Sequence, residues 1–114
     1  MDIIELAAQA LTPISRRGIS VKQGWYNEKL QKAHITLWNL SDSDGGHCDD
    51  AAELTESILQ VNIWAGYDAV ELKKETKELL TKAGFCYQDG QDVEEKPGLY
   101  NKAMRFYYMN ESEE

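Results

Sequence analysis

The sequence is poor in cysteine: it has two, Cys48 and Cys86, among 114 residues, and their spacing matches no CxxC pair. Two isolated thiols cannot build a disulfide framework, so we expect both to be free in a reducing compartment. Long apolar runs are also missing, whereas a membrane-spanning helix needs roughly 18 to 20 apolar residues. The first five residues, MDIIE, lack the basic and apolar regions of a signal peptide. These absences predict a protein that stays in the compartment where it is made.

Basic residues are the second scarcity. The chain has 12 Lys and Arg against 20 Asp and Glu, which gives a formal net charge of −8. Adjacent basic residues occur only at Arg16-Arg17 and Lys73-Lys74. Binding to phosphate backbones depends on Lys and Arg side chains that release counterions. The composition therefore argues against a protein that reads nucleic acid.

The remaining composition is that of a globular domain. Hydrophobic residues make up 42% of the chain and charged residues 28%, which is close to average usage. A length of 114 residues suits one hydrophobic core. We therefore expect a single α+β domain over residues 1–109, followed by an acidic, disordered tail over residues 110–114.

Two helices are predicted. Asp2 and Glu5 have the spacing of a capping box, and apolar residues then recur at near-helical intervals over residues 2–12. Asp68 and Glu71 have the same spacing, and an amphipathic stripe follows as far as residue 83. Because that stripe is apolar on one side only, we expect the second, long helix to cover one face of a sheet.

The strands are predicted from alternation of apolar and polar residues, which is typical of half-buried strands. They cover residues 34–40, 57–65, 85–88 and 99–109, with one short strand near residues 19–22. Polar loops are expected between them over residues 41–53 and 89–98. Together these elements predict an α+β fold, with a mostly antiparallel sheet of about four strands, an N-terminal helix and one long amphipathic helix packed on the sheet.

The loop over residues 42–53 holds the residue types that bind metal ions. Its acidic residues at the first, third, ninth and twelfth positions of a calcium loop are Asp42, Asp44, Asp50 and Glu53. However, Gly46 takes a position that needs an oxygen ligand, and His47 replaces the required glycine. A zinc site at His47 and Cys48 would need two further ligands, for which only His34 and Cys86 remain. We therefore predict a solvated loop that binds neither calcium nor zinc.

Catalytic signatures are missing as well. The sequence contains no GxSxG elbow and no glycine-rich phosphate loop. The neighbouring carboxylates of Asp49-Asp50 or Glu94-Glu95 offer an acid and a base, but such pairs in acidic loops are usually only solvated. The sequence predicts no enzyme, no catalytic residue and no cofactor.

Large aromatic residues are the main surplus. Trp38 and Trp64 lie on the strand faces opposite to the aliphatic residues, and Tyr107 shares a face with Arg105. Two interpretations stay open. The aromatic residues belong either to a second buried layer or to a subunit interface, because Trp, Tyr and Arg are enriched in interface hot spots.

Four segments carry a family resemblance: AHITLWNL at 33–40, Asp49-Asp50 ahead of TESILQVNIWA at 55–65, AGF at 83–85 and GLYNKAMRFYY at 98–108. In this order they resemble the tail terminator proteins of long-tailed bacteriophages and prophages, also described as tail-to-head joining or tail completion proteins. The resemblance involves no catalytic motif.

This resemblance implies a structural virion assembly protein, a homo-oligomer that forms a ring, expected to be a hexamer, on the tail tube. The implied partners are further copies of the chain, the tail tube protein and the head-completion protein. DNA is expected to pass through the ring without specific binding, and no membrane or cofactor is involved. The implied location is the tail-to-head junction of the virion, after assembly in the host cytoplasm.

The candidate interface residues are Trp38, Asp49, Asp50, Trp64, Arg105 and Tyr107. Two alternatives remain at this point: another head-tail connector subunit, or a small non-enzymatic protein-binding module.

Overall fold

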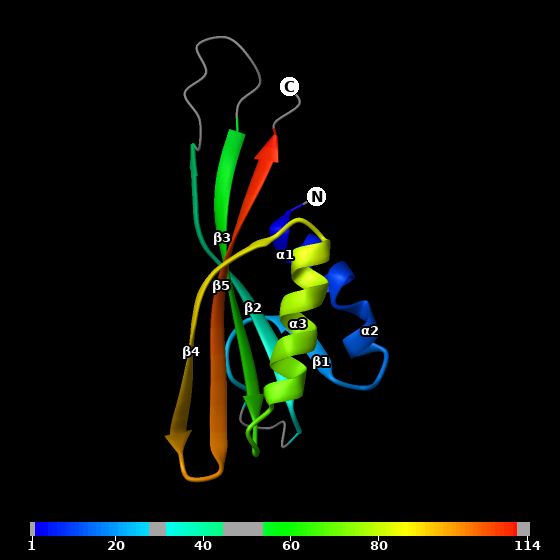
Figure 1. Ribbon diagram of the computed structural model, residues 1–114, viewed down its shortest axis with the longest axis vertical. Helices are drawn as coiled ribbons and strands as arrows, with labels where there is room; N and C mark the ends of the chain where they lie inside the picture. The colour runs from blue at the N-terminus through cyan, green and yellow to red at the C-terminus, as the bar shows by residue number, and fades with distance from the viewer. Residues whose placement is uncertain (1, 28–31, 45–53, 112–114) are drawn as a thin grey trace.

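The computed structural model describes residues 2–27, 32–44 and 54–111 (Figure 1). Along the chain the elements are α1 (Ile3–Ala10), α2 (Thr12–Ser15), β1 (Ser20–Gln23), β2 (His34–Asp44), β3 (Leu54–Ala65), α3 (Val70–Lys82), β4 (Cys86–Lys96) and β5 (Leu99–Glu111). Among the helices of these residues, none is long and apolar enough to cross a membrane.

The strands form one five-stranded mixed sheet in the order β1-β2-β3-β5-β4. β1 runs parallel to β2, with Val21 opposite Ile35, and the other neighbouring strands are antiparallel. β3 and β5 lie near the centre and pair over nearly their whole lengths, from Ala65 opposite Tyr100 to the far ends of both strands.

The predicted fold class is wrong in its sheet and in its helices. The sheet is mixed and has five strands, where the sequence predicts about four mostly antiparallel ones. The helices of the described residues are short, with 8, 4 and 13 residues, so the single long helix is not present in this part of the chain. The sheet is mixed because β1, the short strand predicted near residues 19–22, pairs parallel to β2, and alternation within a strand does not reveal its partner or direction. β4 is longer than predicted because it is polar and exposed along most of its length, which removes the alternation that marks a half-buried strand.

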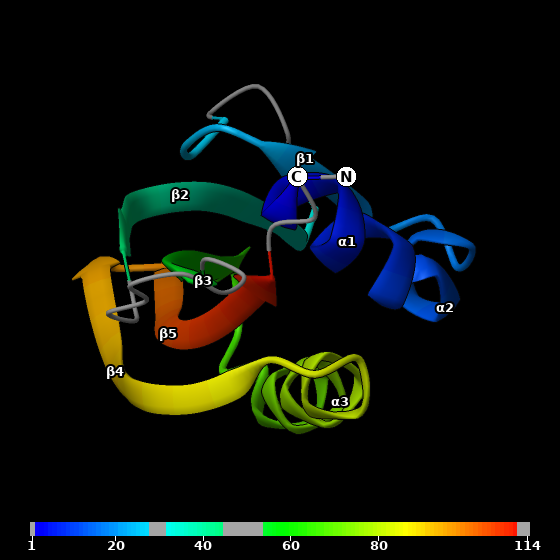
Figure 2. The same cartoon turned by 90° about the horizontal axis from the view of Figure 1, so that it is seen from above.

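One face of the sheet packs against the helices. α1 and α3 lie on the same side of the sheet in the view along the long axis (Figure 2). Buried apolar residues of the strands and helices meet there: Ile35, Leu37, Leu59, Val61, Ile63, Met104 and Phe106 from the sheet, and Ile3, Ala7, Ile14, Leu72 and Leu80 from the helices. Strands contribute alternate residues because successive side chains point to opposite faces. We call this the core face of the sheet and the opposite one the outer face.

Of the two predicted capping boxes, only the one at the start of α1 is present. The Asp2 carboxylate accepts a hydrogen bond from the Glu5 backbone N–H at 2.9 Å, and the Glu5 carboxylate accepts one from the Asp2 N–H, which confirms the first capping box. α3 begins at Val70 without a side-chain cap, so the second capping box is wrong. The Asp68 carboxylate instead pairs with Lys102 of β5.

At one end of the molecule, β2, β3 and β5 extend past the helices (Figure 1). We call residues 41–44, 54–58 and 107–111 of these strands the arm. A register shift between Asn39 and Ser41 marks the point where β2 enters it. The loop predicted over residues 41–53 is therefore wrong for residues 41–44, which continue β2, and residues 45–53 lie outside the described part of the chain.

At the other end, β4 and β5 form a tight hairpin (Figure 1). Pro97 and Gly98 connect them, and Gly98 has a φ of +86°, a conformation that glycine adopts without strain. Within β4, a Cβ added to Gly90 would overlap the Tyr87 hydroxyl, so the absence of a side chain there leaves room for that ring. The polar loop predicted over residues 89–98 is wrong, because most of this segment belongs to β4.

Candidate functional site

Four predicted interface residues lie on the outer face of the sheet, three of them toward the arm. Trp38 is opposite Gln60, and Gln60 is opposite Arg105 in the next strand. Tyr107 lies two residues further along β5, so its side chain points to the same face as that of Arg105. Trp38 is 46% exposed, and the buried core cluster lies on the opposite face. The structure thus brings Trp38, Arg105 and Tyr107 together on one uncovered surface.

Arg105 forms a two-pronged ion pair with Asp89 of β4. The guanidinium Nε and Nη2 atoms donate to the two carboxylate oxygens at 2.8 and 2.6 Å. This hydrogen bonding lowers the pKa of Asp89 and raises the pKa of Arg105. Both side chains are about half exposed, so the pair adds little to stability, but it fixes the direction of the guanidinium plane. With Gln60 and Gln91, the pair lines a shallow hollow of about 320 Å³.

Trp64 lies on the outer face at the other end of β3, and its surroundings differ. It is 3% exposed, because the segment after β1 folds over it. The Trp25 and Tyr26 rings lie 5.6 and 5.0 Å from its ring centroid, and its Nε1 donates to Thr36 Oγ1 at 3.0 Å. Trp64 is thus separated from the Trp38 surface, and the exposed tryptophan at this end is Trp25.

Asp49 and Asp50 lie outside the described residues, so their interface role stays a prediction. Two further exposed apolar residues, Leu40 and Met109, were not predicted from the sequence. Met109 continues the alternation of Arg105 and Tyr107 and therefore lies on the outer face. Leu40 is exposed where the register of β2 shifts, and no sequence signal marks that shift.

A row of amide side chains crosses the outer face between the arm and the hairpin. Gln60 Nε2 donates to Asn62 Oδ1, Asn62 Nδ2 donates to Asn101 Oδ1 at 2.8 Å, and Asn101 Nδ2 donates to the Glu95 carboxylate. A carboxylate accepts but does not donate, so Glu95 sets the direction of every bond in the row. This row orients polar groups without leaving one of its members unpaired.

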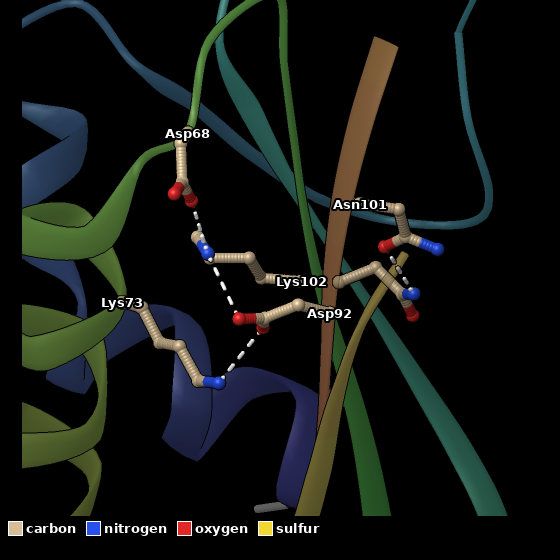
Figure 3. Close-up of polar contacts among 6 residues, drawn as sticks. Asp68, Lys73, Asp92, Asn101 and Lys102 are labelled. Carbon is tan, nitrogen blue, oxygen red and sulfur yellow. Dashed lines mark hydrogen bonds and ion pairs between the residues drawn. The ribbon is translucent and has the colours of Figure 1, made fainter. Parts of the chain in front are cut away.

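On the core face, Lys102 joins the hairpin to the start of α3 (Figure 3). Its Nζ lies 2.5 Å from an Asp68 oxygen and 3.1 Å from an Asp92 oxygen, and Lys73 Nζ lies 2.9 Å from the other Asp92 oxygen. Burial lowers the pKa of Lys102, but the hydrogen bonds to Asp68 and Asp92 outweigh it and raise the pKa overall. The hydrogen bond from Lys73 is the largest cause that lowers the pKa of Asp92. The two lysines and two aspartates of this cluster balance in charge, so the cluster stabilises the packing of β4 and β5 against the start of α3.

Only part of the predicted metal-binding segment, residues 42–53, lies within the described residues. Among the described residues, no group of three or more His, Cys, Asp or Glu side chains is placed to hold a metal ion. Asp42 accepts hydrogen bonds from Ser57 Oγ at 2.6 Å and from Asn39 Nδ2 at 3.2 Å, which hold its pKa below the usual value. Residues 46–53 lie outside the described part, so the absence of calcium and zinc binding stays a prediction.

The chain matches no known protein-family model and no curated protein. Its fold is similar to a chain of a gene transfer agent virion. The solved structure is the virion of a native gene transfer agent particle, with a TM-score of 0.65 and 11% sequence identity. The match covers 93% of this chain and 92% of the virion chain. Because the match spans almost the full length of both chains, the likeness concerns the overall fold and is not limited to one local motif.

Proposed function

We propose that this protein is a non-enzymatic structural subunit of a phage-like virion. The observation that carries the proposal is the fold that it shares with the gene transfer agent virion chain over 93% of its length. The proposal includes no cofactor and no catalytic residue. The subunit acts through protein contacts, for which the outer face with the exposed Trp38 and the half-buried Tyr107 offers suitable chemistry.

Within this class, the sequence resemblance supports the role of a tail terminator. Its longer segments lie on the three central strands β2, β3 and β5, and the short AGF segment follows α3. In this role several copies, expected to be six, form a ring at the tail-to-head junction that caps the tail tube and contacts the head-completion protein. The net charge of −8 suits a ring through which DNA moves, since like charges do not adhere.

Two measurements test the proposal: the molar mass of the protein in solution and its effect on the elongation of tail tubes. We expect light scattering to give a mass above 13.0 kDa that rises with concentration, and negative-stain images to show rings. Added to growing tail tubes, the protein should stop elongation and appear at one tube end. A ring that leaves elongation unchanged but binds the head-completion protein would favour the alternative connector role. A monomer at every concentration that neither stops elongation nor binds tubes would refute the tail terminator role.

A further inference from the structure

We infer that copies of this chain associate head to tail, with the outer face of the arm on one copy against the outward side of α3 on the next. The inference rests on the proposed function, in which copies assemble, and it adds the two surfaces that meet. The arm surface consists of Glu56, Tyr107 and Met109 of the arm, together with Trp38 and Leu40, which precede the arm in β2. The helix surface consists of Tyr67, Val70, Lys74, Lys77 and Thr81.

Apolar exposure is concentrated on these two surfaces. Six large hydrophobic side chains are exposed in the described residues, and five belong to the two surfaces: Trp38, Leu40, Tyr67, Val70 and Met109. The sixth, Trp25, is in edge contact with Trp64. Clustered exposed apolar side chains are typical of protein contact sites. Two separate clusters suggest two contacts for each copy.

The charges of the arm as a whole and of the helix surface are opposite. The described strand segments of the arm contain Asp42, Asp44, Glu56 and Glu111 and no Lys or Arg. In the sequence, residues 40–56 and 109–114 hold nine of the twenty acidic residues and none of the twelve basic ones, so the rest of the chain has a formal charge of +1. Two arms therefore repel each other, and a lysine-bearing surface is the better partner for an arm.

The helix surface supplies those lysines. Val70, Lys74, Lys77 and Thr81 recur at helical spacing on the exposed side of α3. Lys74 makes no ion pair with any described residue, whereas the neighbouring Glu75 is held by Arg17 at 2.7 Å. The lysine side chains border a shallow hollow of about 630 Å³. Lys77 Nζ already lies 4.0 Å from the centroid of the Tyr87 ring in the same chain, so Lys74 is the lysine whose stem and ammonium group can pack against an indole ring such as that of Trp38.

The topology allows both contacts at once. The arm surface belongs to the outer face of the sheet, and α3 packs on the core face, so one copy can hold a neighbour on each side. Contacts between two different surfaces continue from copy to copy and close into a ring when the rotation between copies allows it. A two-fold contact between identical surfaces would stop at a dimer.

Two paired variants test this arrangement. The arm variant carries Trp38→Ser with Met109→Ser, and the helix variant carries Val70→Ser with Lys74→Glu. All four side chains are exposed, so we expect both variants to keep the unfolding midpoint of the parent. As matched controls, Trp25→Ser removes an exposed tryptophan and Lys22→Glu reverses an exposed lysine outside both surfaces.

The masses measured by light scattering decide the outcome. We expect each paired variant to associate at least about 30-fold more weakly than the parent, as hot-spot losses do, while the controls associate normally. An equal mixture of the two variants should form a heterodimer and nothing larger, because only one competent contact remains.

Other outcomes refute the inference in distinguishable ways. A helix variant that still assembles alone would indicate an arm-to-arm contact, and two variants that both assemble like the parent would place the contact elsewhere. Either result leaves the proposed function standing. A parent that stays at 13.0 kDa at all concentrations would count against self-assembly itself and so against both proposals.

Discussion

The buried ammonium of Lys102 allows a direct test of how the β4–β5 hairpin is held to α3. The Lys102 side chain is 4% exposed, whereas the Asp68 and Asp92 side chains are 62% and 55% exposed. Lys102→Met keeps the buried apolar stem and leaves two carboxylates that water can solvate. We therefore expect it to cost no more than about 1 kcal/mol of unfolding free energy. Removing both carboxylates leaves a buried charge without an acceptor.

The double variant Asp68→Ala with Asp92→Ala should therefore cost more, about 3 kcal/mol, at the low end of the range for breaking a buried pair because water partly reaches the site. Adding Lys102→Met to the double variant should recover about 2 kcal/mol, because the stranded charge is then gone. Lys73→Met, which removes only a partly exposed contact to Asp92, serves as the control at about 0.5 kcal/mol. Urea denaturation followed by tryptophan fluorescence measures each value. A triple variant no more stable than the double variant would show the reasoning to be wrong.

Three further predictions concern single side chains. The folded-state pKa of Asp92 is lowered, so its contribution is present above the unfolded value of about 3.9 and lost as the pH falls through the folded value. Asp92→Asn should flatten the pH dependence of the unfolding free energy in this acid range, and an unchanged slope in acid titrations would contradict that. Gly90→Val should displace the Tyr87 ring and cost about 2 kcal/mol, which thermal unfolding would detect and an unaltered midpoint would disprove. Thr76→Val should stabilise by about 1 kcal/mol in urea titrations, since the Thr76 hydroxyl is buried and has no partner among the described residues. A loss of stability would mean that the hydroxyl is satisfied in solution.

Local signals predicted the parts of the fold that depend on neighbours in sequence. The capping box of α1 and the alternation within β3 were sufficient because each involves residues two to three positions apart. The start of α3 could not be predicted in this way. Asp68 has the spacing of a cap, but it is drawn to Lys102, whose position depends on the pairing of β4 with β5. A tertiary ion pair overrode a local preference.

The residues of the candidate surface could be predicted only in part from the sequence, for a similar reason. The alternation correctly put Trp38 and Arg105 on faces opposite the aliphatic residues, but it could not separate exposed from covered positions. Trp64 obeys the same alternation as Trp38, yet the segment bearing Trp25 covers it. When a loop distant in sequence covers a residue, the alternation around that residue does not show it.

The two edge strands of the sheet affect the tendency of many copies to aggregate by strand pairing. β4 loses register twice, beside Gln88 and beside Glu95, and it carries three further carboxylates at Asp89, Asp92 and Glu94. β1, on the opposite side, is only four residues long. Long, flat and apolar edges recruit strands from other chains, whereas short, charged or interrupted edges resist this. Copies at high local concentration are therefore guided toward contacts between side chains, and the open-ended ladder of backbone hydrogen bonds that leads to fibrils is disfavoured at both edges.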